Sequence, residues 1–141
     1  AEEITYKIVK NYVRFLREEG VKTVKAVGYY EEKEFPHYLQ PSLEFDFIGR
    51  KELNWYLKPV GTTANNFSEM NFDVLIDLSG NRCLPVLFLC STSPAGMKIG
   101  KYSEKYQYLY DFMIDLAQKK TLSYYLEQVT YYLKLINKNE P

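Results

Sequence analysis

A run of apolar residues at 72–78 constrains the fold of this chain more than any other feature. It reads Phe-Asp-Val-Leu-Ile-Asp-Leu, so its five apolar residues are interrupted only by aspartates near the two ends. A strand that is apolar on both faces must be covered on both faces, which is typical of a parallel sheet between layers of helices. Ligands of such sheets bind beyond the carboxyl ends of the strands, so a binding site is expected at 79–82.

The length and charge of the chain narrow its class. Its 141 residues suit a single domain over 1–141, and 46% hydrophobic with 26% charged residues is ordinary for a soluble globular protein. Eighteen basic residues balance eighteen acidic ones, which removes any broad attraction to nucleic acid or to an anionic membrane but allows a local patch. No signal peptide or membrane span is visible and the two cysteines form no disulfide framework, so we expect a cytoplasmic protein.

Apolar periodicity predicts the order of the helices and strands. Amphipathic helices are expected near both ends, the last one capped by Thr121, and strands between them. The expected helices cover 2–19, 65–71 and 121–136, and the expected strands cover 21–30, 43–48, 72–78, 95–100 and 108–116.

The segment 84–90 leaves two topologies open. As a helix it would be capped by Asn81, would hold Pro85 in its first turn and would end at Pro94. As a second buried strand it would close a hairpin with 72–78, since short apolar runs do not distinguish the two. A parallel neighbour for 72–78 needs a crossover of about a dozen residues, so the helix is favoured.

Aromatic residues are abundant, and we expect most of them to be structural. Fourteen tyrosines and eight phenylalanines make the chain 16% aromatic. Such side chains commonly cover sheet edges and helix seams, which is favoured here over an aromatic ligand platform. The lone Trp55 is expected to anchor the loop around it to the body of the protein.

A second stripe on the final helix predicts an interface. It consists of Tyr124, Gln128, Tyr131 and Leu135, beside a complete core face. The helix therefore has more apolar surface than one contact with a sheet would cover, which predicts a homodimer or another protein partner. The alternative is packing on the N-terminal helix.

The motifs of common enzymes are missing. The one histidine, His37, lies in a proline-flanked loop, and neither zinc-ligand spacing, a nucleophile elbow nor a glycine-rich phosphate loop is present. Asp111 and Asp115 would share a strand face near Asp77 and could perform acid–base chemistry if they faced it, but structural aspartates at sheet ends are favoured. We therefore predict no catalytic residue, no metal and no cofactor.

Polar side chains at the predicted strand ends form a candidate ligand site. They are Asp77, Ser79, Asn81 and Arg82 after the central strand, and Ser91, Ser93 and Lys98 around the start of the next. Backbone N–H groups near Asn81 and the charge of Arg82 suit a phosphate or a carboxylate. The alternative is that these residues only cap the helix and form the turn.

Two resemblances rest on these segments. The runs 71–79, 93–100 and 110–115 resemble a family of small uncharacterised bacterial proteins, and that resemblance extends over most of the chain from about Val21. The run 72–80 and the segment Ala-Gly-Met-Lys-Ile-Gly at 95–100 are similar to part of the N-terminal half of heptosyltransferase-like sugar transferases. The second resemblance implies a Rossmann-like strand–helix–strand order. It does not imply sugar-transferase activity, because this chain has no room for the second domain that supplies the nucleotide-sugar site in those enzymes.

The expected fold is a single three-layer α/β domain, Rossmann-like, with a mostly parallel sheet of about five strands flanked by helices. The favoured function is a non-enzymatic binding or protein-interaction module. The alternative is a small enzyme or ligand-binding domain for an anionic small molecule, such as a sugar phosphate or a nucleotide-like compound, at the carboxyl ends of the strands.

Overall fold

The computed structural model describes residues 2–32, 34–79, 83–116 and 119–138. Helices and strands alternate along most of the chain, as the sequence predicts. In chain order the elements are α1 (Glu2–Glu18), β1 (Ala26–Tyr30), β2 (Phe45–Gly49), the 3-10 turn η1 (Arg50–Glu52), α2 (Thr62–Glu69), β3 (Val74–Ile76), α3 (Leu84–Thr92), β4 (Met97–Lys101), the 3-10 turn η2 (Gln107–Leu109), β5 (Phe112–Ile114) and α4 (Leu122–Lys138).

The strands form two small parallel sheets where a single sheet of about five strands was expected. β1 pairs with β2 over five residues, and β3, β4 and β5 form a separate sheet in that order. The mixed α/β class is confirmed, but the continuous sheet is not what the described residues show. Apolar patterns indicate which segments are strands, but they do not indicate which strands pair. Pairing uses backbone N–H and C=O groups, which differ little from one residue to the next.

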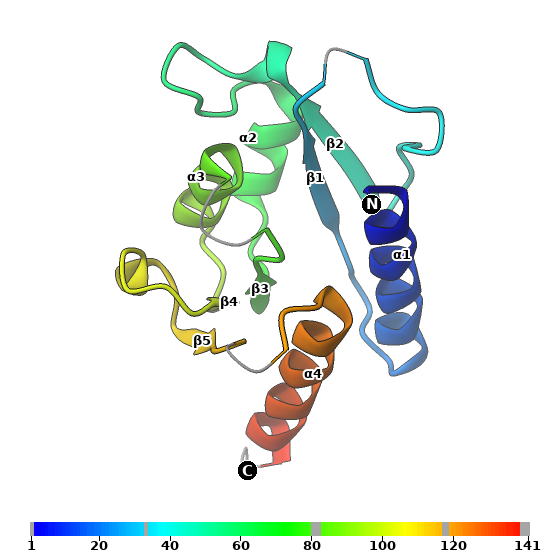
Figure 1. Cartoon of the computed structure of the whole chain (residues 1–141), viewed down its shortest axis with the longest axis vertical. Helices are drawn as coiled ribbons and strands as arrows, with labels where there is room; N and C mark the ends of the chain where they lie inside the picture. Colours follow the sequence, from blue (N-terminus) through cyan, green and yellow to red (C-terminus); the bar gives the residue numbers. More distant parts are fainter. Residues whose placement is uncertain (1, 33, 80–82, 117–118, 139–141) are drawn as a thin grey trace.

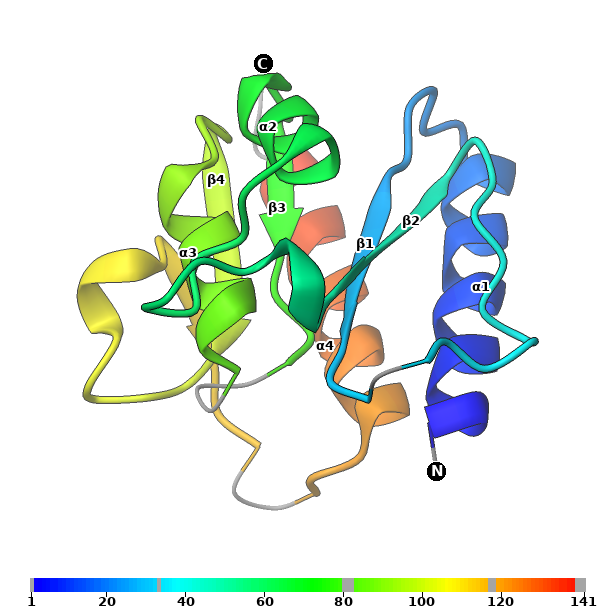
Figure 2. The ribbon, with the colours of Figure 1, turned by 90° about the horizontal axis from the view of Figure 1, so that it is seen from above.

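Helices lie on both sides of the strands (Figures 1 and 2). On one side α2 and α3 cover a core that includes Ile48, Phe67 and Leu75. On the other side α4 covers a core built from Ile99, Ile114, Tyr125 and Val129. α1 lies beside α4 and places the ring of Tyr6 against Phe45 and Phe47 of β2, with ring centroids 5.5 and 5.8 Å apart.

β3 is covered on both faces, as its apolar run predicts. Leu75 belongs to the core beneath α2 and α3, whereas Val74 and Ile76 pack into the core beneath α4. Because successive side chains of a strand point to opposite faces, Asp77 extends the Leu75 side of the strand toward α3. This alternation places a carboxylate at the carboxyl end of the strand.

The segment 84–90 is helical, which confirms the crossover topology. α3 holds Pro85 in its first turn and ends at Thr92, two residues before Pro94. Its N-cap is Cys83, while the predicted cap, Asn81, lies outside the described residues. The cap of α4 is also confirmed, since the Oγ1 of Thr121 accepts a hydrogen bond from the backbone N–H of Tyr124 at 3.2 Å.

The expectation that Trp55 anchors its loop to the body of the protein is wrong. The side chain is 90% exposed, and it lies in the segment between η1 and α2 that projects from the body in Figure 1. An indole usually anchors a loop by being buried. The loop is held instead by hydrogen bonds of Asn54, which is a small polar residue with no apolar signature in the sequence.

Candidate functional site

Asp77 is the buried centre of a polar cluster at the carboxyl end of β3. Only 3% of the residue is exposed. Its Oδ1 accepts hydrogen bonds from the backbone N–H and the hydroxyl of Ser79, at 2.8 and 2.6 Å, and its Oδ2 accepts one from the hydroxyl of Tyr110. A carboxylate is tolerated away from water when its oxygens have donors, so these contacts allow Asp77 to be buried.

Tyr110 reaches Asp77 only because residue 100 has no side chain. A Cβ atom at Gly100 of β4 would lie 2.5 to 2.7 Å from three carbons of the Tyr110 ring. The ring therefore packs directly against the backbone of β4, and its hydroxyl extends beyond that strand to the end of β3. Gly100 is a requirement of this contact.

Tyr125 of α4 binds the same strand end from the opposite face. Its ring is fully buried, and its hydroxyl donates a hydrogen bond to the backbone oxygen of Asp77 at 2.7 Å. The Nζ of Lys101 lies 5.4 Å from the centroid of this ring. We call Asp77, Ser79, Tyr110 and Tyr125 the Asp77 cluster; together they join β3, α4 and the segment before β5.

The tyrosine hydroxyls and the thiol around Asp77 favour their protonated forms. Burial raises the pKa of the Tyr110 and Tyr125 hydroxyls, and the negative charge of Asp77 raises it further. The same two causes raise the pKa of the buried Cys90 thiol, whereas burial lowers the pKa of Lys101. A thiol kept in this form is a poor nucleophile, so Cys90 is a packing residue.

The described residues of the predicted ligand site lie in two separate groups. Asp77 and Ser79 lie at the carboxyl end of β3. Ser91, Ser93 and Lys98 lie at or before the amino end of β4, because α3 carries the chain back across the sheet. Asn81 and Arg82 are outside the described residues.

The second group of predicted site residues makes local structural contacts. The Oγ of the buried Ser93 accepts a hydrogen bond from the N–H of Ala95 at 3.3 Å, and the Nζ of Lys98 donates to the backbone oxygen of Ser91 at 3.5 Å. Asp111 accepts from the N–H of Lys98 at 2.8 Å, so it holds the amino end of β4 and does not face Asp77. Within the described residues, no group of three acidic, histidine or cysteine side chains is placed to bind a metal.

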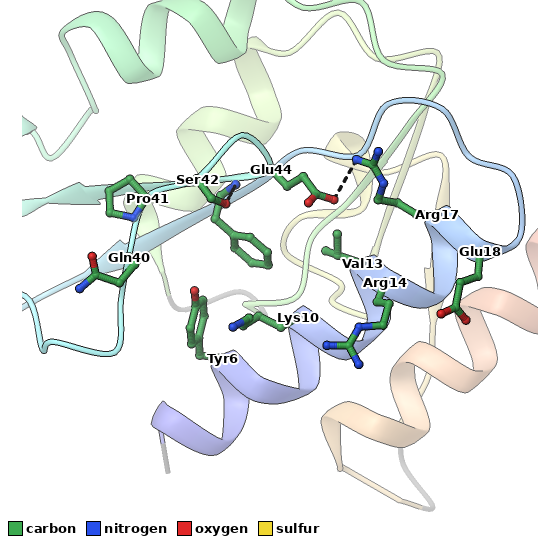
Figure 3. A pocket seen from close by; sticks show the side chains of 11 residues that line it. Tyr6, Lys10, Val13, Arg14, Arg17, Glu18, Gln40, Pro41, Ser42 and Glu44 are labelled. Atoms are coloured by element: carbon green, nitrogen blue, oxygen red, sulfur yellow. Dashed lines mark hydrogen bonds and ion pairs between the residues drawn. The ribbon is translucent and has the colours of Figure 1, made fainter.

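An open groove of about 570 Å³ lies on another part of the surface, between α1 and the segment 40–45 (Figure 3). Sequence reasoning missed it. Tyr6, Val13 and Phe45 supply its apolar surface, and Gln40 and Ser42 supply polar groups on the side facing α1. Three basic residues of α1, at 10, 14 and 17, and the acidic Glu18 also line it. The helical spacing of the basic residues was the signal available in the sequence.

The basic groups of the groove are not equivalent. Arg17 forms an ion pair with Glu44 across the groove, with Nη1 and Oε2 3.1 Å apart, as the dashed line in Figure 3 shows. The Nζ of Lys10 lies 5.4 Å from the centroid of the Tyr6 ring. Within the described part of the chain, neither Lys10 nor Arg14 forms an ion pair. These two cations are therefore available to an incoming anion.

Comparison with known proteins identifies one family whose model matches most of the chain. The family of unknown function DUF6913 matches residues 1–136. The chain belongs to this family. The DUF6913 match includes the Asp77 cluster and the groove, and it confirms the expected resemblance to a family without an assigned activity. A bacterial origin and the heptosyltransferase similarity stay expectations.

Neither the curated proteins nor the solved structures contain a match to this DUF6913 chain. Its structure adds a separate finding about membranes: among the described residues, none of the helices combines the length and apolar character needed to cross a bilayer.

Proposed function

We propose that this DUF6913 chain is a non-enzymatic binding module that holds an acidic segment of a partner protein in the groove beside α1. The observation that carries the proposal is the open groove with the cations of Lys10 and Arg14. At the carboxyl end of β3, where an α/β protein commonly places its chemistry, both oxygens of Asp77 already accept hydrogen bonds from this chain.

The dimensions of the groove suit a short extended peptide. Tyr6 and Arg17 lie about 16 Å apart along α1, given a rise of about 1.5 Å per residue. An extended chain rises about 3.3 Å per residue, so roughly five residues would span that length. Side chains two residues apart in such a peptide are separated by about 6.6 Å, which is close to the axial separation of about 6 Å between Lys10 and Arg14. Acidic residues at alternate positions would therefore face both cations.

The side of the groove that faces α1 is held in place by local hydrogen bonds. The Nε2 of Gln40 donates to the backbone oxygen of His37 at 2.6 Å, and the Oγ of Ser42 accepts from the N–H of Phe45 at 3.3 Å. This segment is therefore ordered before a ligand arrives, which lowers the entropic cost of binding. Exposed charge pairs contribute only about 0.2 to 1 kcal/mol each, so we expect moderate affinity that falls as salt increases.

Reversing the two free cations is expected to abolish most of the binding. The probe is a fluorescent peptide of alternating glutamate and alanine, titrated by anisotropy with a glutamine version as the uncharged comparison. Lys10→Glu with Arg14→Glu replaces two attractions by two repulsions, so affinity should fall about tenfold or more. The control is Lys22→Glu with Lys120→Glu, which makes the same charge change outside the groove. Equal binding by the two double variants would contradict the proposal.

The outer edge of α4 favours a second interface, a homodimer. Tyr131 and Leu135 are 56% and 39% exposed, while Tyr124 and Gln128 are half-buried. Packing on the N-terminal helix accounts for another part of α4, where the hydroxyls of Tyr12 and Thr130 are hydrogen-bonded at 2.8 Å. That packing leaves the Tyr131–Leu135 edge uncovered, so we propose that two copies meet through it.

Light scattering over a concentration series tests the homodimer. The unmodified chain should show a mass that rises toward two copies, and Tyr131→Asp with Leu135→Asp should stay at one copy because two charges would be buried at the interface. Ser123→Asp adds a charge to an exposed position of the same helix outside the stripe and should leave the association unchanged. A constant mass of one copy for the unmodified chain would overturn this proposal.

A further inference from the structure

The loop at 53–60 is braced by its own hydrogen bonds. Leu53 and Pro59 form an isolated antiparallel bridge. The Oδ1 of Asn54 accepts hydrogen bonds from the N–H groups of Tyr56 and Lys58, at 3.1 and 3.0 Å, and the backbone of Asn54 makes two more, with Lys58 and Leu57. Leu57 has a φ of 70°, a left-handed conformation that a residue with a branched side chain rarely adopts. The loop therefore has one defined shape.

This defined shape exposes apolar side chains. Trp55 is almost fully exposed, and Tyr56, Leu57 and Val60 are also among the exposed large apolar residues. The Trp55 ring meets the Tyr56 ring edge to face with centroids 5.0 Å apart, and Tyr56 in turn contacts Phe88 of α3 at 6.0 Å. The loop thus presents an aromatic surface that consists of the almost uncovered Trp55 ring and the partly covered Tyr56 ring beside it.

Positive charge flanks the aromatic surface. Segment 53–61 contains no acidic residue, while Lys58 lies within it and Arg50 and Lys51 precede it. The carboxylate of the nearest acid, Glu52, accepts a hydrogen bond from the N–H of Gly49 at 3.2 Å, and the pair between Arg50 and Glu31 is solvent-exposed. Within the described residues, neither Lys51 nor Lys58 forms an ion pair. Segment 50–61 therefore carries a net positive charge in a chain whose total charge is balanced, because it holds three basic residues and one acidic residue.

We infer that the loop at 53–60 docks on an anionic lipid bilayer, with Trp55 and Leu57 in the interfacial region and Lys51 and Lys58 among the headgroups. Tryptophan and tyrosine favour the membrane–water interface, and cations next to them are attracted to anionic lipid. The loop projects from the body (Figure 1), so its exposed side chains can reach a flat surface such as a bilayer.

Docking through this loop is compatible with the proposed peptide groove. The loop lies on the side of the molecule away from α1 in both Figure 1 and Figure 2. A bilayer at the loop would therefore leave the groove open to the aqueous phase. The inference rests on residues that the groove does not use, so the two proposals can fail separately.

Trp55 is the sole tryptophan of the chain, so its fluorescence reports directly on the loop. With vesicles of phosphatidylcholine and phosphatidylglycerol, its emission should shift to the blue and become protected from acrylamide quenching. Pure phosphatidylcholine vesicles should produce a much smaller shift, and added salt should reverse the binding. An unchanged emission with the anionic vesicles, or equal shifts with both kinds, would overturn the inference.

Co-sedimentation with vesicles tests the basic and the apolar residues of the loop separately. Lys51→Gln with Lys58→Gln should weaken binding to the anionic vesicles by about 25-fold, and Trp55→Ala with Leu57→Ala should weaken it at least as much. Tyr108→Ala removes an equally exposed ring elsewhere, and Lys10→Glu with Arg14→Glu alters the groove; both should sediment like the unmodified chain. Undiminished sedimentation of either loop variant would show that another surface binds the lipid.

Discussion

Replacing Asp77 with alanine is expected to lower the free energy of unfolding by about 2 to 3 kcal/mol. The substitution leaves the Tyr110 hydroxyl without its acceptor and removes a buried side chain that holds the Ser79 turn. A half-buried donor that loses its partner costs about 1 to 3 kcal/mol, while exposed Ser79 regains hydrogen bonds from water. Urea unfolding followed by circular dichroism measures the loss.

Two further variants assign this effect to the hydrogen bonds. Asp77→Asn keeps the volume and one carbonyl acceptor, so it should recover part of the lost stability. Tyr110→Phe should cost about 1 kcal/mol alone and much less in the Asp77→Ala background, because its partner is then already missing. A gain in stability on removing the carboxylate would contradict this structural role, since it would show that Asp77 is a strained group retained for another purpose.

Gly100→Ala is expected to destabilise the protein by about 1 to 3 kcal/mol. The new methyl group would lie 2.5 Å from the nearest carbon of the Tyr110 ring, and the ring cannot move away without losing its hydrogen bond to Asp77. The expected result is therefore a combined loss of packing and of the hydrogen bond, measured again by urea unfolding.

The cause of the Gly100 effect can be tested with a matched glycine. At Gly28 an added Cβ would lie 3.3 Å from the Phe47 ring, which requires only a small adjustment, so Gly28→Ala should have a much smaller effect. Gly100→Ala should also become nearly neutral when Tyr110 is replaced by alanine, because the obstructing ring is gone. An undiminished loss of stability from Gly100→Ala in the Tyr110→Ala background would show that the loss arises from the backbone of β4.

The candidate site shows where pattern reasoning stops. Asp77 was correctly placed at the end of a buried strand, because an apolar run within seven residues is a local property. Its partner Tyr110 is 33 positions away, and nothing in the sequence near either residue indicates the hydrogen bond. The glycine that admits the ring, Gly100, is informative only after the strand register is known.

The same limit explains the groove and the exposed loop. The basic spacing of Lys10 and Arg14 was visible on a predicted helix, but the facing residues Gln40 and Ser42 come from an irregular connection whose path the sequence does not reveal. Trp55 was interpreted by the usual preference of indole rings for burial. Its exposure follows from the hydrogen bonds of Asn54, which hold the loop away from the body.

By itself the sequence determined the strand at 74–76 and the threonine cap of the last helix, and it favoured, against a strand, the helix at 84–92 with proline in its first turn. These depend on periodicity, side-chain capping and the missing N–H of proline, which act over a few residues. Only the tertiary structure decided that the strands divide into two sheets, that Ser91, Ser93 and Lys98 lie away from Asp77, and which cations line a groove. Those outcomes depend on contacts between strand edges and side chains that are far apart in the chain. Such contacts produce no periodic pattern in the sequence.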